Sequence, residues 1–352
     1  MKIILFSPNI KRGQKQLNGG ILNWTISYLN NYNNNIHHID VVNTHLIGKR
    51  KTGVVKKISL KDEISRTYTI FKEFLRLTKS CNYDVAHVNS SAGKFGIFRE
   101  YLIALILKKK KIKLILHFHC NLEDTIGTSR IRRYVFVKLC RLSKNVILLN
   151  NYSLEYSLTI SKETNKFSVI PNFIEENFIK KSKNIQNDIT QVIFVGFIQP
   201  SKGCNEIFDL AKTRTDLNFT LVGKLHQGYN KFVLPDNIRI ISCEDRNCVM
   251  KILDKSDVFL FPSYSEGFSL ALLEGMSRGL PIITTDVGAN KEMIETSGGK
   301  IVSHDIETIN QALIEFQDSE TRRQISQWNI NKVQSKYTVG KVLERIFEIY
   351  QE

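Results

Sequence analysis

The sequence of 352 residues contains no uninterrupted apolar run that approaches the roughly 18 residues of a membrane-spanning helix. The longest candidate, residues 101–107 (YLIALIL), ends at Lys108. The chain begins directly with a strand pattern at residues 2–7 and lacks the basic region, apolar stretch and cleavage site of a signal peptide. We therefore expect a cytoplasmic protein, either soluble or peripheral at the inner face of the cell membrane.

Paired cysteine motifs are missing as well. The six cysteines are scattered, and although Cys243 and Cys248 are spaced as C-x4-C, no second pair completes a zinc site. We expect reduced thiols, as in most cytosolic proteins. No G-x-G-x-x-G follows the first strand pattern, which argues against a dinucleotide-dependent dehydrogenase.

Acidic residues are scarce in the first half of the chain. Residues 1–175 hold 29 Lys and Arg against 11 Asp and Glu, a net charge of +18, although the whole chain carries +16. Such a surface suits nucleic acid or an anionic membrane. No nucleic-acid motif with interleaved stacking aromatics is present, so we favour the membrane and expect no nucleic-acid partner. Basic amphipathic patterns support this at residues 64–79, 101–111 and 129–144, although ordinary helices with solvated basic faces would look the same.

Strand patterns alternate with helical patterns along the whole chain. This alternation predicts an α/β protein with two doubly wound parallel sheets that face each other across a cleft. We expect one domain at residues 1–175, a second at 176–338, and a C-terminal helix at 339–352 that packs back across the seam. The expected strands lie at residues 2–7, 37–43, 84–90, 113–119, 145–150, 167–171, 191–196, 218–223, 237–242, 257–263, 280–285 and, weakly, 299–303.

The segment EGFSLALLE at residues 266–274 is the most informative stretch. It places Glu266 in a glycine turn, and Glu274 inside a helix that starts near Ser269. The free N–H groups and dipole of a helix N-terminus bind anions, so Glu266 would stand beside an anion site. A ligand that carries both phosphate and sugar hydroxyls fits this pair, which is typical of a nucleotide-sugar site.

Other residues fit the same chemistry. Gly19 and Gly20 precede a helical pattern, and Gly196 ends a strand pattern six residues before Lys202, where a second helix opens. Such glycines let the backbone approach a ligand closely, and a lysine can neutralise a diphosphate. His119 alternates with His117 near the end of the 113–119 strand pattern, so both rings leave one face. One histidine in the cleft and one packed is the simplest interpretation.

In their order and spacing these residues resemble the retaining family 4 glycosyltransferases with the GT-B fold, over essentially the whole chain. Within that family the sequence is most similar to bacterial transferases that build O-antigen or capsule polysaccharide. The residues that carry the resemblance are Gly19, Gly20, His119, residues 171–172, Gly196, Lys202, residues 221–223 and 266–274, and the following residues 280–294.

The resemblance implies a donor, roles and a mechanism. Glu266 would contact the donor sugar, Glu274 the ribose, Lys202 and Gly20 the diphosphate, and His119 the reacting sugar. Further backbone contacts to the sugar and phosphate would come from Gly267, Phe268, Ser269 and Leu270. The donor would be a UDP- or GDP-sugar, and the acceptor a glycan that we expect to be lipid-linked. One departure is Phe197, which stands where many members have an arginine; Lys224 is a candidate substitute.

The sequence also contains no Asp-x-Asp, the pair that holds a metal ion in many transferases. We therefore expect a retaining transfer that uses no metal and no cofactor. Two alternatives stay open on the sequence alone. One is a nucleotide-sugar epimerase of the same fold, and the other is a basic nucleotide-binding or nucleic-acid-binding module without turnover.

Overall fold

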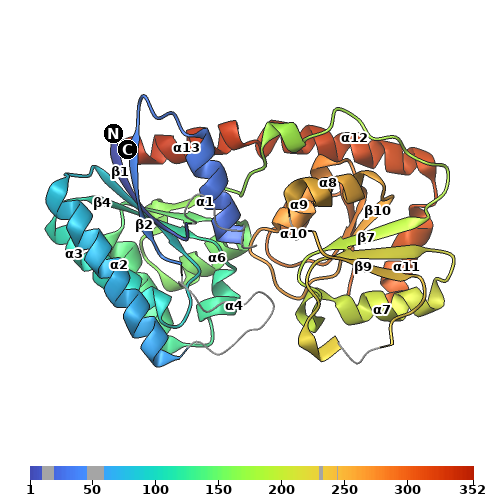
Figure 1. Ribbon diagram of the computed structural model, residues 1–352, viewed down its shortest axis with the longest axis horizontal. Helices are drawn as coiled ribbons and strands as arrows, with labels where there is room; N and C mark the ends of the chain where they lie inside the picture. Colours follow the sequence, from blue (N-terminus) through green and yellow to red (C-terminus); the bar gives the residue numbers. More distant parts are fainter. Residues whose placement is uncertain (10–19, 46–58, 230–232, 244) are drawn as a thin grey trace. The chain divides into compact units, whose positions relative to one another are not determined.

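The computed structural model describes residues 1–9, 20–45, 59–229, 233–243 and 245–352 (Figure 1). The chain forms two compact units. Unit 1 comprises Met1–Asn172 together with Val339–Glu352, and unit 2 comprises Phe173–Thr338. All twelve expected strands are present, six in each unit, and every strand pair is parallel, which confirms the α/β class.

The sheet of unit 1 has the strand order β2-β1-β3-β4-β5-β6. Its inner strands are buried over nearly their whole length, because helices cover both faces and no side of the pleat meets water. The strands are β1 (Lys2–Ser7), β2 (His38–Asn43), β3 (Val85–Ser90), β4 (Lys113–Phe118), β5 (Asn145–Leu148) and β6 (Phe167–Val169).

The helices of unit 1 divide between the two faces of this sheet. Phe74, Leu107 and Phe136 bring α2, α3 and α5 into one core with Phe6 and Leu116 of the strands. The opposite face holds α1 and α13, which pack against each other. The helices are α1 (Gly20–Asn31), α2 (Leu60–Ser80), α3 (Gly96–Lys109), α4 (Leu122–Ile126), α5 (Arg130–Leu142), α6 (Asn151–Ile160) and α13 (Val339–Gln351), with the 3₁₀ turn η1 (Thr164–Lys166).

The sheet of unit 2 has the order β12-β11-β10-β7-β8-β9. Its strands are β7 (Gln191–Val195), β8 (Asn218–Val222), β9 (Ile238–Ile241), β10 (Val258–Phe261), β11 (Ile282–Thr284) and β12 (Gly299–Ile301). The helices are α7 (Cys204–Thr213), α8 (Arg246–Asp254), α9 (Leu270–Ser277), α10 (Asn290–Ile294), α11 (Ile306–Glu315) and α12 (Ser319–Lys336), with η2 (Glu176–Phe178), η3 (Pro200–Lys202) and η4 (Gln227–Tyr229). None of the helices among the described residues combines the length and the apolar character needed to cross a membrane.

Both strand orders contain one point where the direction of winding reverses. In unit 1 it lies between β1 and β3, and in unit 2 it lies between β7 and β10. Loops that leave adjacent strands at such a point turn to opposite faces, so a crevice opens at the carboxyl ends, where doubly wound proteins bind ligands. Lys202 follows β7 and Glu266 follows β10, so the fold brings the two expected site loops of unit 2 to this point.

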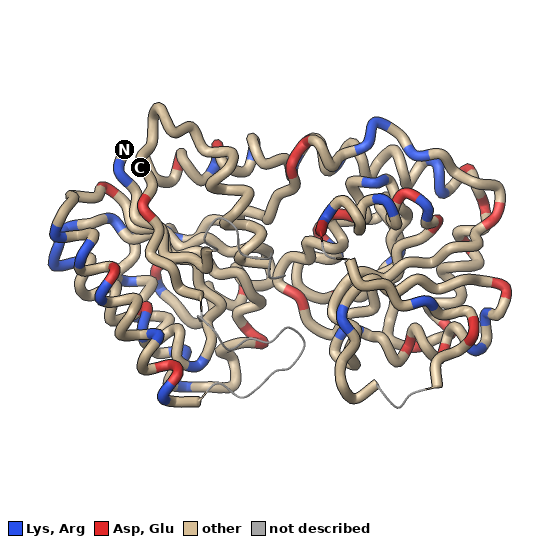
Figure 2. Tube along the Cα trace, in the orientation of Figure 1, with Lys and Arg blue, Asp and Glu red and all other residues tan. Residues whose placement is uncertain are grey.

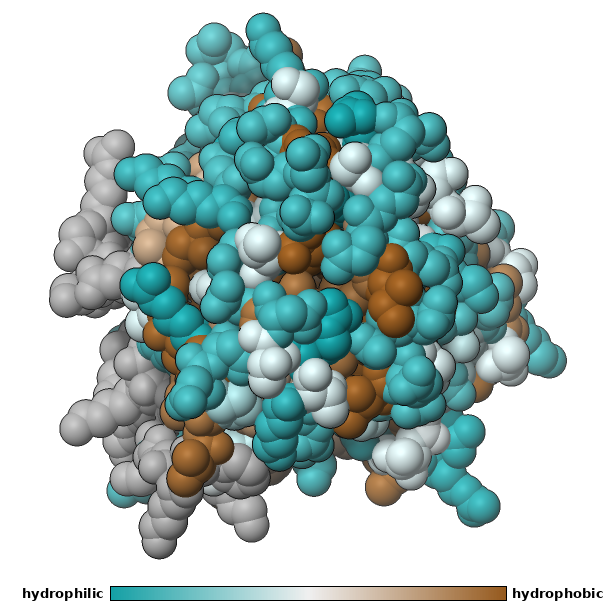
Figure 3. Space-filling model, turned by 90° about the vertical axis from the view of Figure 1, so that its right-hand side faces the viewer, coloured by the Kyte–Doolittle hydropathy of each residue, from teal (hydrophilic) through white to brown (hydrophobic). Residues whose placement is uncertain are grey.

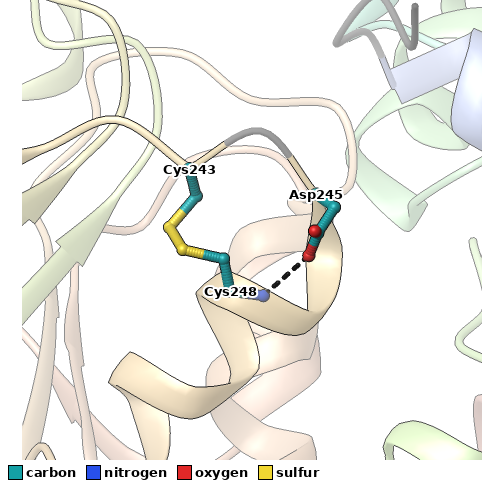
Figure 4. The surroundings of a disulfide bond; sticks show 3 residues. All are labelled: Cys243, Asp245 and Cys248. Carbon is teal, nitrogen blue, oxygen red and sulfur yellow. Dashed lines mark hydrogen bonds between the residues drawn. A yellow bond between two sulfur atoms is a disulfide. The ribbon is translucent and has the colours of Figure 1, made fainter.

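The expectation of reduced thiols is wrong for one pair of cysteines. Cys243 follows β9, and Cys248 lies in the first turn of α8, where Asp245 caps the helix by accepting a hydrogen bond from the Cys248 N–H at 2.8 Å (Figure 4). The helical turn brings the two Cα atoms to 5.7 Å, and the sulfur atoms form a disulfide. Cys81, Cys120, Cys140 and Cys204 are free.

Gly203 offers a test of this architecture, because it joins η3 to α7 with φ +73° and its Cα faces the carbonyl oxygen of Pro262. A Cβ atom there would overlap that oxygen in a left-handed conformation that side chains disfavour. We expect Gly203→Ala to lower the free energy of unfolding by about 2 kcal/mol or more. Urea unfolding followed by circular dichroism measures this.

The matched control is Gly93→Ala, whose added methyl group meets only Ser91 Oγ at 3.6 Å. We expect this control to stay within about 0.5 kcal/mol of the wild type. Equal destabilisation by both substitutions would contradict the close approach of the two loops at Gly203.

Candidate active site

The loop from β10 to α9 builds the anion-binding position in unit 2. Ser269 is the N-cap of α9, and its hydroxyl accepts a hydrogen bond from the Leu272 N–H at 3.2 Å. The first-turn N–H groups of a helix have no partner within the helix, so those of Leu270 and Ala271 remain available for an anion. Phe268 anchors the loop by packing edge-on against Tyr337, with 5.5 Å between ring centroids.

Glu266 and Lys202 form an ion pair beside that helix start. The Lys202 Nζ lies 2.5 Å from Glu266 Oε1, although 64 residues separate the two in sequence. Both side chains are largely buried, with exposed fractions of 24% for Lys202 and 12% for Glu266. A pair shielded to this degree holds each charge in place, and removal of either partner would leave the other charge poorly solvated.

The loop after β11 packs against the turn that carries Glu266 and supports it. The Ala289 N–H donates a hydrogen bond to the Gly267 carbonyl at 3.0 Å. Gly288 has φ +54°, and a Cβ atom there would overlap the carbonyl oxygen of Glu266. The glycine of the DVGAN sequence therefore lets the two loops meet at backbone distance, which fixes the direction of the Glu266 side chain.

Glu274 lies inside α9, as expected, and is paired with an arginine. The Arg246 Nε donates a hydrogen bond to Glu274 Oε1 at 2.8 Å, and the guanidinium stacks on the Phe178 ring at 4.7 Å. Burial raises the pKa of the Glu274 carboxyl, and the charge of Arg246 partly opposes this shift. The result is a carboxylate held in one orientation with its second oxygen still able to accept a hydrogen bond.

Gly196 and Phe197 leave the end of β7 beside the end of β8. The Gly196 N–H donates to the Val222 carbonyl at 3.0 Å, and the Ile198 N–H donates to the Lys224 carbonyl at 2.9 Å. The Phe197 ring packs edge-on against His226 at 6.3 Å. The backbone of Lys224, the candidate substitute for an arginine at position 197, thus lies beside the segment that carries Phe197.

In unit 1, Gly20 is the first residue of α1 and is exposed. Among the described residues, no atom lies within 4 Å of a Cβ added at this helix start. Gly19, the other expected residue of this pair, lies outside the described residues.

His119 and His117 come together at the end of β4, with 4.0 Å between their ring centroids. His117 is fully buried, whereas His119 is partly exposed. The His119 Nε2 lies 2.9 Å from Asn89 Oδ1 of β3, and Asn89 also binds His87 at 3.0 Å. Burial lowers the pKa of His119 to about 3 and that of His87 to about 4, so both rings are neutral near pH 7.

Sequence reasoning missed the partners of these groups. Arg246 gave no signal, because it lies 28 residues from Glu274 and on another helix. Asn89 and His87 did give one: they alternate on a strand, so they share a face at its carboxyl end, as His117 and His119 do.

Comparison with known proteins defines the class. Residues 175–332 match the family model for the glycosyl transferases group 1, which spans nearly all of unit 2. The protein is therefore a glycosyltransferase. More particularly, unit 2 is a glycosyl transferases group 1 domain, and the whole chain has the GT-B architecture of two six-stranded parallel sheets.

Two relatives are similar over most of the chain. An uncharacterized 41.2 kDa protein in the cps region of Klebsiella pneumoniae is 25% identical over 82% of this chain and 84% of its own length. The UDP-Gal:alpha-D-GlcNAc-diphosphoundecaprenol alpha-1,3-galactosyltransferase of Escherichia coli is 24% identical over 84% of this chain and 81% of its own.

Two solved structures show the same fold at low sequence identity. Sucrose-phosphate synthase from Thermosynechococcus elongatus has a TM-score of 0.80 at 14% identity and covers 99% of this chain and 98% of its own. Anabaena HepE in complex with UDP and glucose has a TM-score of 0.74 at 16% identity, with 100% of both chains covered.

The neutral histidines of unit 1 make its stability depend on pH. Their pKa values are lowered in the folded state, so below an ordinary pKa of about 6.5 only the unfolded chain takes up these protons, and stability is lost as pH falls. We expect His87 and His119 each to remove roughly 1.4 kcal/mol per pH unit between about pH 6 and pH 4.

Urea unfolding in a Trp328→Phe background measures this, because Trp24 is then the sole tryptophan and reports on unit 1. His119→Asn should reduce the slope of the unfolding free energy against pH by roughly 1.4 kcal/mol per pH unit, the contribution of one proton. His38→Asn, at a side chain that is 63% exposed, is the control. An unchanged slope in His119→Asn would contradict a His119 that stays neutral in the folded state.

Proposed function

We propose that this glycosyltransferase moves a hexose from a nucleotide sugar to a lipid-linked glycan, with retention of configuration and without a metal ion, during synthesis of a cell-surface polysaccharide. The observation that carries the proposal is the Lys202–Glu266 ion pair at the N-terminus of α9. It combines a cation and helix N–H groups for phosphate with a carboxylate for sugar hydroxyls.

The chemistry explains why these groups belong together. Cleavage of the bond from the anomeric carbon to the phosphate oxygen leaves negative charge on the diphosphate, which must be stabilised by groups fixed beforehand. In unit 2, Lys202, the first-turn N–H groups of α9 and the backbone at Gly196 supply that stabilisation. Because no Asp-x-Asp occurs in the sequence, these groups replace the metal ion in the proposal.

The ion pair describes the arrangement before the donor binds. On binding, the diphosphate takes over Lys202, and Glu266 turns its freed oxygen to a hydroxyl of the donor sugar. Glu274, held by Arg246, accepts the ribose hydroxyls through its second oxygen. The departing phosphate then takes the proton from the acceptor hydroxyl, and His119 contacts the reacting sugar.

Two relatives support the choice of substrates. The Escherichia coli relative is named for transfer from UDP-Gal to an acceptor on diphosphoundecaprenol, and Anabaena HepE is bound to UDP and glucose. A uridine donor and an acceptor carried on a lipid diphosphate are therefore the first pair to test.

Purified protein incubated with a panel of UDP-, GDP- and ADP-hexoses should release nucleotide slowly from one of them and faster when a glycan-diphosphate-lipid acceptor is added. We expect Lys202→Ala and Glu266→Gln each to lower kcat by about 10²-fold, since each removes a group that stabilises the transition state. Lys212→Ala, on the exposed side of α7, is the matched control. Activity should survive chelation with EDTA.

Nucleotide release that persists unchanged in both variants would contradict the site. A sugar altered without an acceptor would instead indicate an epimerase, and loss of activity with EDTA that Mg²⁺ restores would contradict the metal-free mechanism.

A surface of unit 1 suits a lipid-linked acceptor. The helices α3 and α5 lie side by side and expose apolar side chains in place of the usual polar ones. Leu102 of α3 is 50% exposed, and Ile131 and Tyr134 of α5 are 67% and 63% exposed. Around Tyr134, a shallow hollow of about 370 Å³ is lined by Arg130, Arg133, Lys138 and Arg141. We call this the α3–α5 surface.

Its composition fits the interface of an anionic membrane, where apolar side chains insert and basic ones meet the headgroups. Figure 2 shows Lys and Arg along the helices of unit 1. The face that unit 2 presents in Figure 3 is mostly hydrophilic, with its apolar residues in separate small patches. We propose that the protein is peripheral at the cytoplasmic face of the membrane, through the α3–α5 surface.

Binding to vesicles tests this surface. The protein should bind vesicles that contain about 30% phosphatidylglycerol, an anionic lipid content that recruits basic surfaces. It should not bind vesicles of phosphatidylcholine alone. Arg133→Glu combined with Lys138→Glu should weaken binding at least about 30-fold, because each basic residue contributes about 1 kcal/mol. Lys291→Glu combined with Lys300→Glu, in unit 2, is the control; equal loss in both double variants would contradict the assignment.

A further inference from the structure

A chain of hydrogen bonds crosses the face of unit 1 that α1 and α13 cover, and it branches to His119 at Asn89. It involves side chains from two helices, from two strands and from His119, which directly follows β4, and most of them are fully buried. From one end of the hydrogen-bond chain, the participants are Ile21, Thr25, Ser7 and Asn89. Asn89 contacts both His119 and His87, and the chain continues from His87 to Tyr350 and Tyr28. The direction in which each bond runs decides which nitrogen of His119 carries the proton.

The direction is fixed at one end by a backbone carbonyl. The Thr25 hydroxyl donates to the Ile21 carbonyl at 2.7 Å, and a carbonyl can only accept. The single proton of Thr25 is then used, so its oxygen must accept from the Ser7 hydroxyl, which lies 2.5 Å away. Ser7 in turn has no proton left for Asn89, and it accepts from the Asn89 amide at 2.8 Å.

This orientation of the Asn89 amide sets both histidines that contact it. Its Nδ2 points to Ser7, so its Oδ1 points to His119 Nε2 at 2.9 Å and to His87 Nε2 at 3.0 Å. An amide oxygen accepts only, so both Nε2 atoms must carry protons. The reversed amide would require Ser7 to donate to Asn89, which would leave the oxygens of Ser7 and Thr25 in contact with no proton between them.

The hydrogen bonds of His87, Tyr350 and Tyr28, at the other end of the hydrogen-bond chain, agree with this protonation of His87. A neutral His87 protonated on Nε2 has a lone pair on Nδ1, and the Tyr350 hydroxyl lies 2.6 Å from that atom as donor. Tyr350 then accepts from Tyr28 at 3.1 Å. Both rings are neutral because burial lowers the pKa of His87 to about 4 and that of His119 to about 3.

We propose that this chain of bonds holds His119 as the Nε2–H tautomer, so that Nδ1 offers a lone pair to a substrate hydroxyl, and that Thr25 of α1 is a positioning residue for His119. Within the described residues, Nδ1 of His119 makes no hydrogen bond, and the side chain is partly exposed. The use of that lone pair by a sugar hydroxyl rests on the proposed function, whereas the tautomer itself does not.

Thr25 acts at a distance through Ser7 and Asn89. Without the Thr25 hydroxyl, Ser7 no longer has to donate to Thr25 and can donate to the Asn89 side chain instead. The Asn89 amide can then reverse, which turns its NH2 group toward Nε2 of both histidines and removes the oxygen that His119 needs. His119 would then populate both tautomers.

Nitrogen-15 NMR of protein labelled in its histidines measures the tautomers directly, because protonated and unprotonated ring nitrogens differ widely in chemical shift. His119→Gln assigns the His119 signals. We expect the wild type to show His119 only as the Nε2–H form, and Thr25→Val, which removes the hydroxyl at nearly the same side-chain volume, to show a second set of His119 signals. The same variant should lower kcat/KM for transfer by about threefold to tenfold, the size of one hydrogen bond.

Tyr28→Phe is the matched control. It removes a hydroxyl from the same cluster, but the bonds from Ile21 through Thr25 and Ser7 to Asn89 stay intact, so the His119 tautomer should not change. Both variants should lower the unfolding temperature alike, which separates positioning from general stability.

His119 protonated on Nδ1 in the wild type would overturn the proposal, and so would identical His119 spectra in Thr25→Val and Tyr28→Phe. The expected spectra in a protein with no transferase activity would support the tautomer while counting against the proposed function.

Discussion

Parallel strands joined by right-handed crossovers constrain everything else in this protein. Every loop that follows a strand must emerge at the carboxyl edge of its sheet, and the reversal of winding separates two neighbouring loops there. In unit 2 these are the loops after β7 and β10, which carry Lys202 and Glu266. The ion pair therefore follows from topology, although its two residues are 64 positions apart.

The two units orient their polar groups by the same means. In unit 2, Arg246 holds Glu274 and the loop at Gly288 supports Glu266. In unit 1, Asn89 holds His119. In each case a second buried polar group satisfies one atom of the site residue and leaves another atom available. Buried polar groups that are fully paired resist rotation, because any other orientation loses hydrogen bonds that water cannot replace.

Much of the fold was predictable, because each strand is a short apolar run and helices cover the sheets on both faces. The segment at residues 266–274 predicted its own local structure well, since Ser269 is a good N-cap and Gly267 suits the turn. The thiols of Cys243 and Cys248 were misjudged, because their pairing depends on where α8 begins after β9. Phe197 was recognised as a departure, but its packing against His226 was not foreseeable from spacing.

The helix and strand types, the alternation of strands with helices and the kinds of side chain available to bind a nucleotide sugar could all be predicted from the sequence. Each of these depends on residues that are near each other along the chain. Only the tertiary structure decided which groups are paired: Lys202 with Glu266, Arg246 with Glu274, and Tyr350 with His87. These partners lie on different elements, and packing alone brings them within hydrogen-bond distance. The protonated nitrogen of His119 belongs to this second group, since it depends on bonds that extend as far as the carbonyl of Ile21.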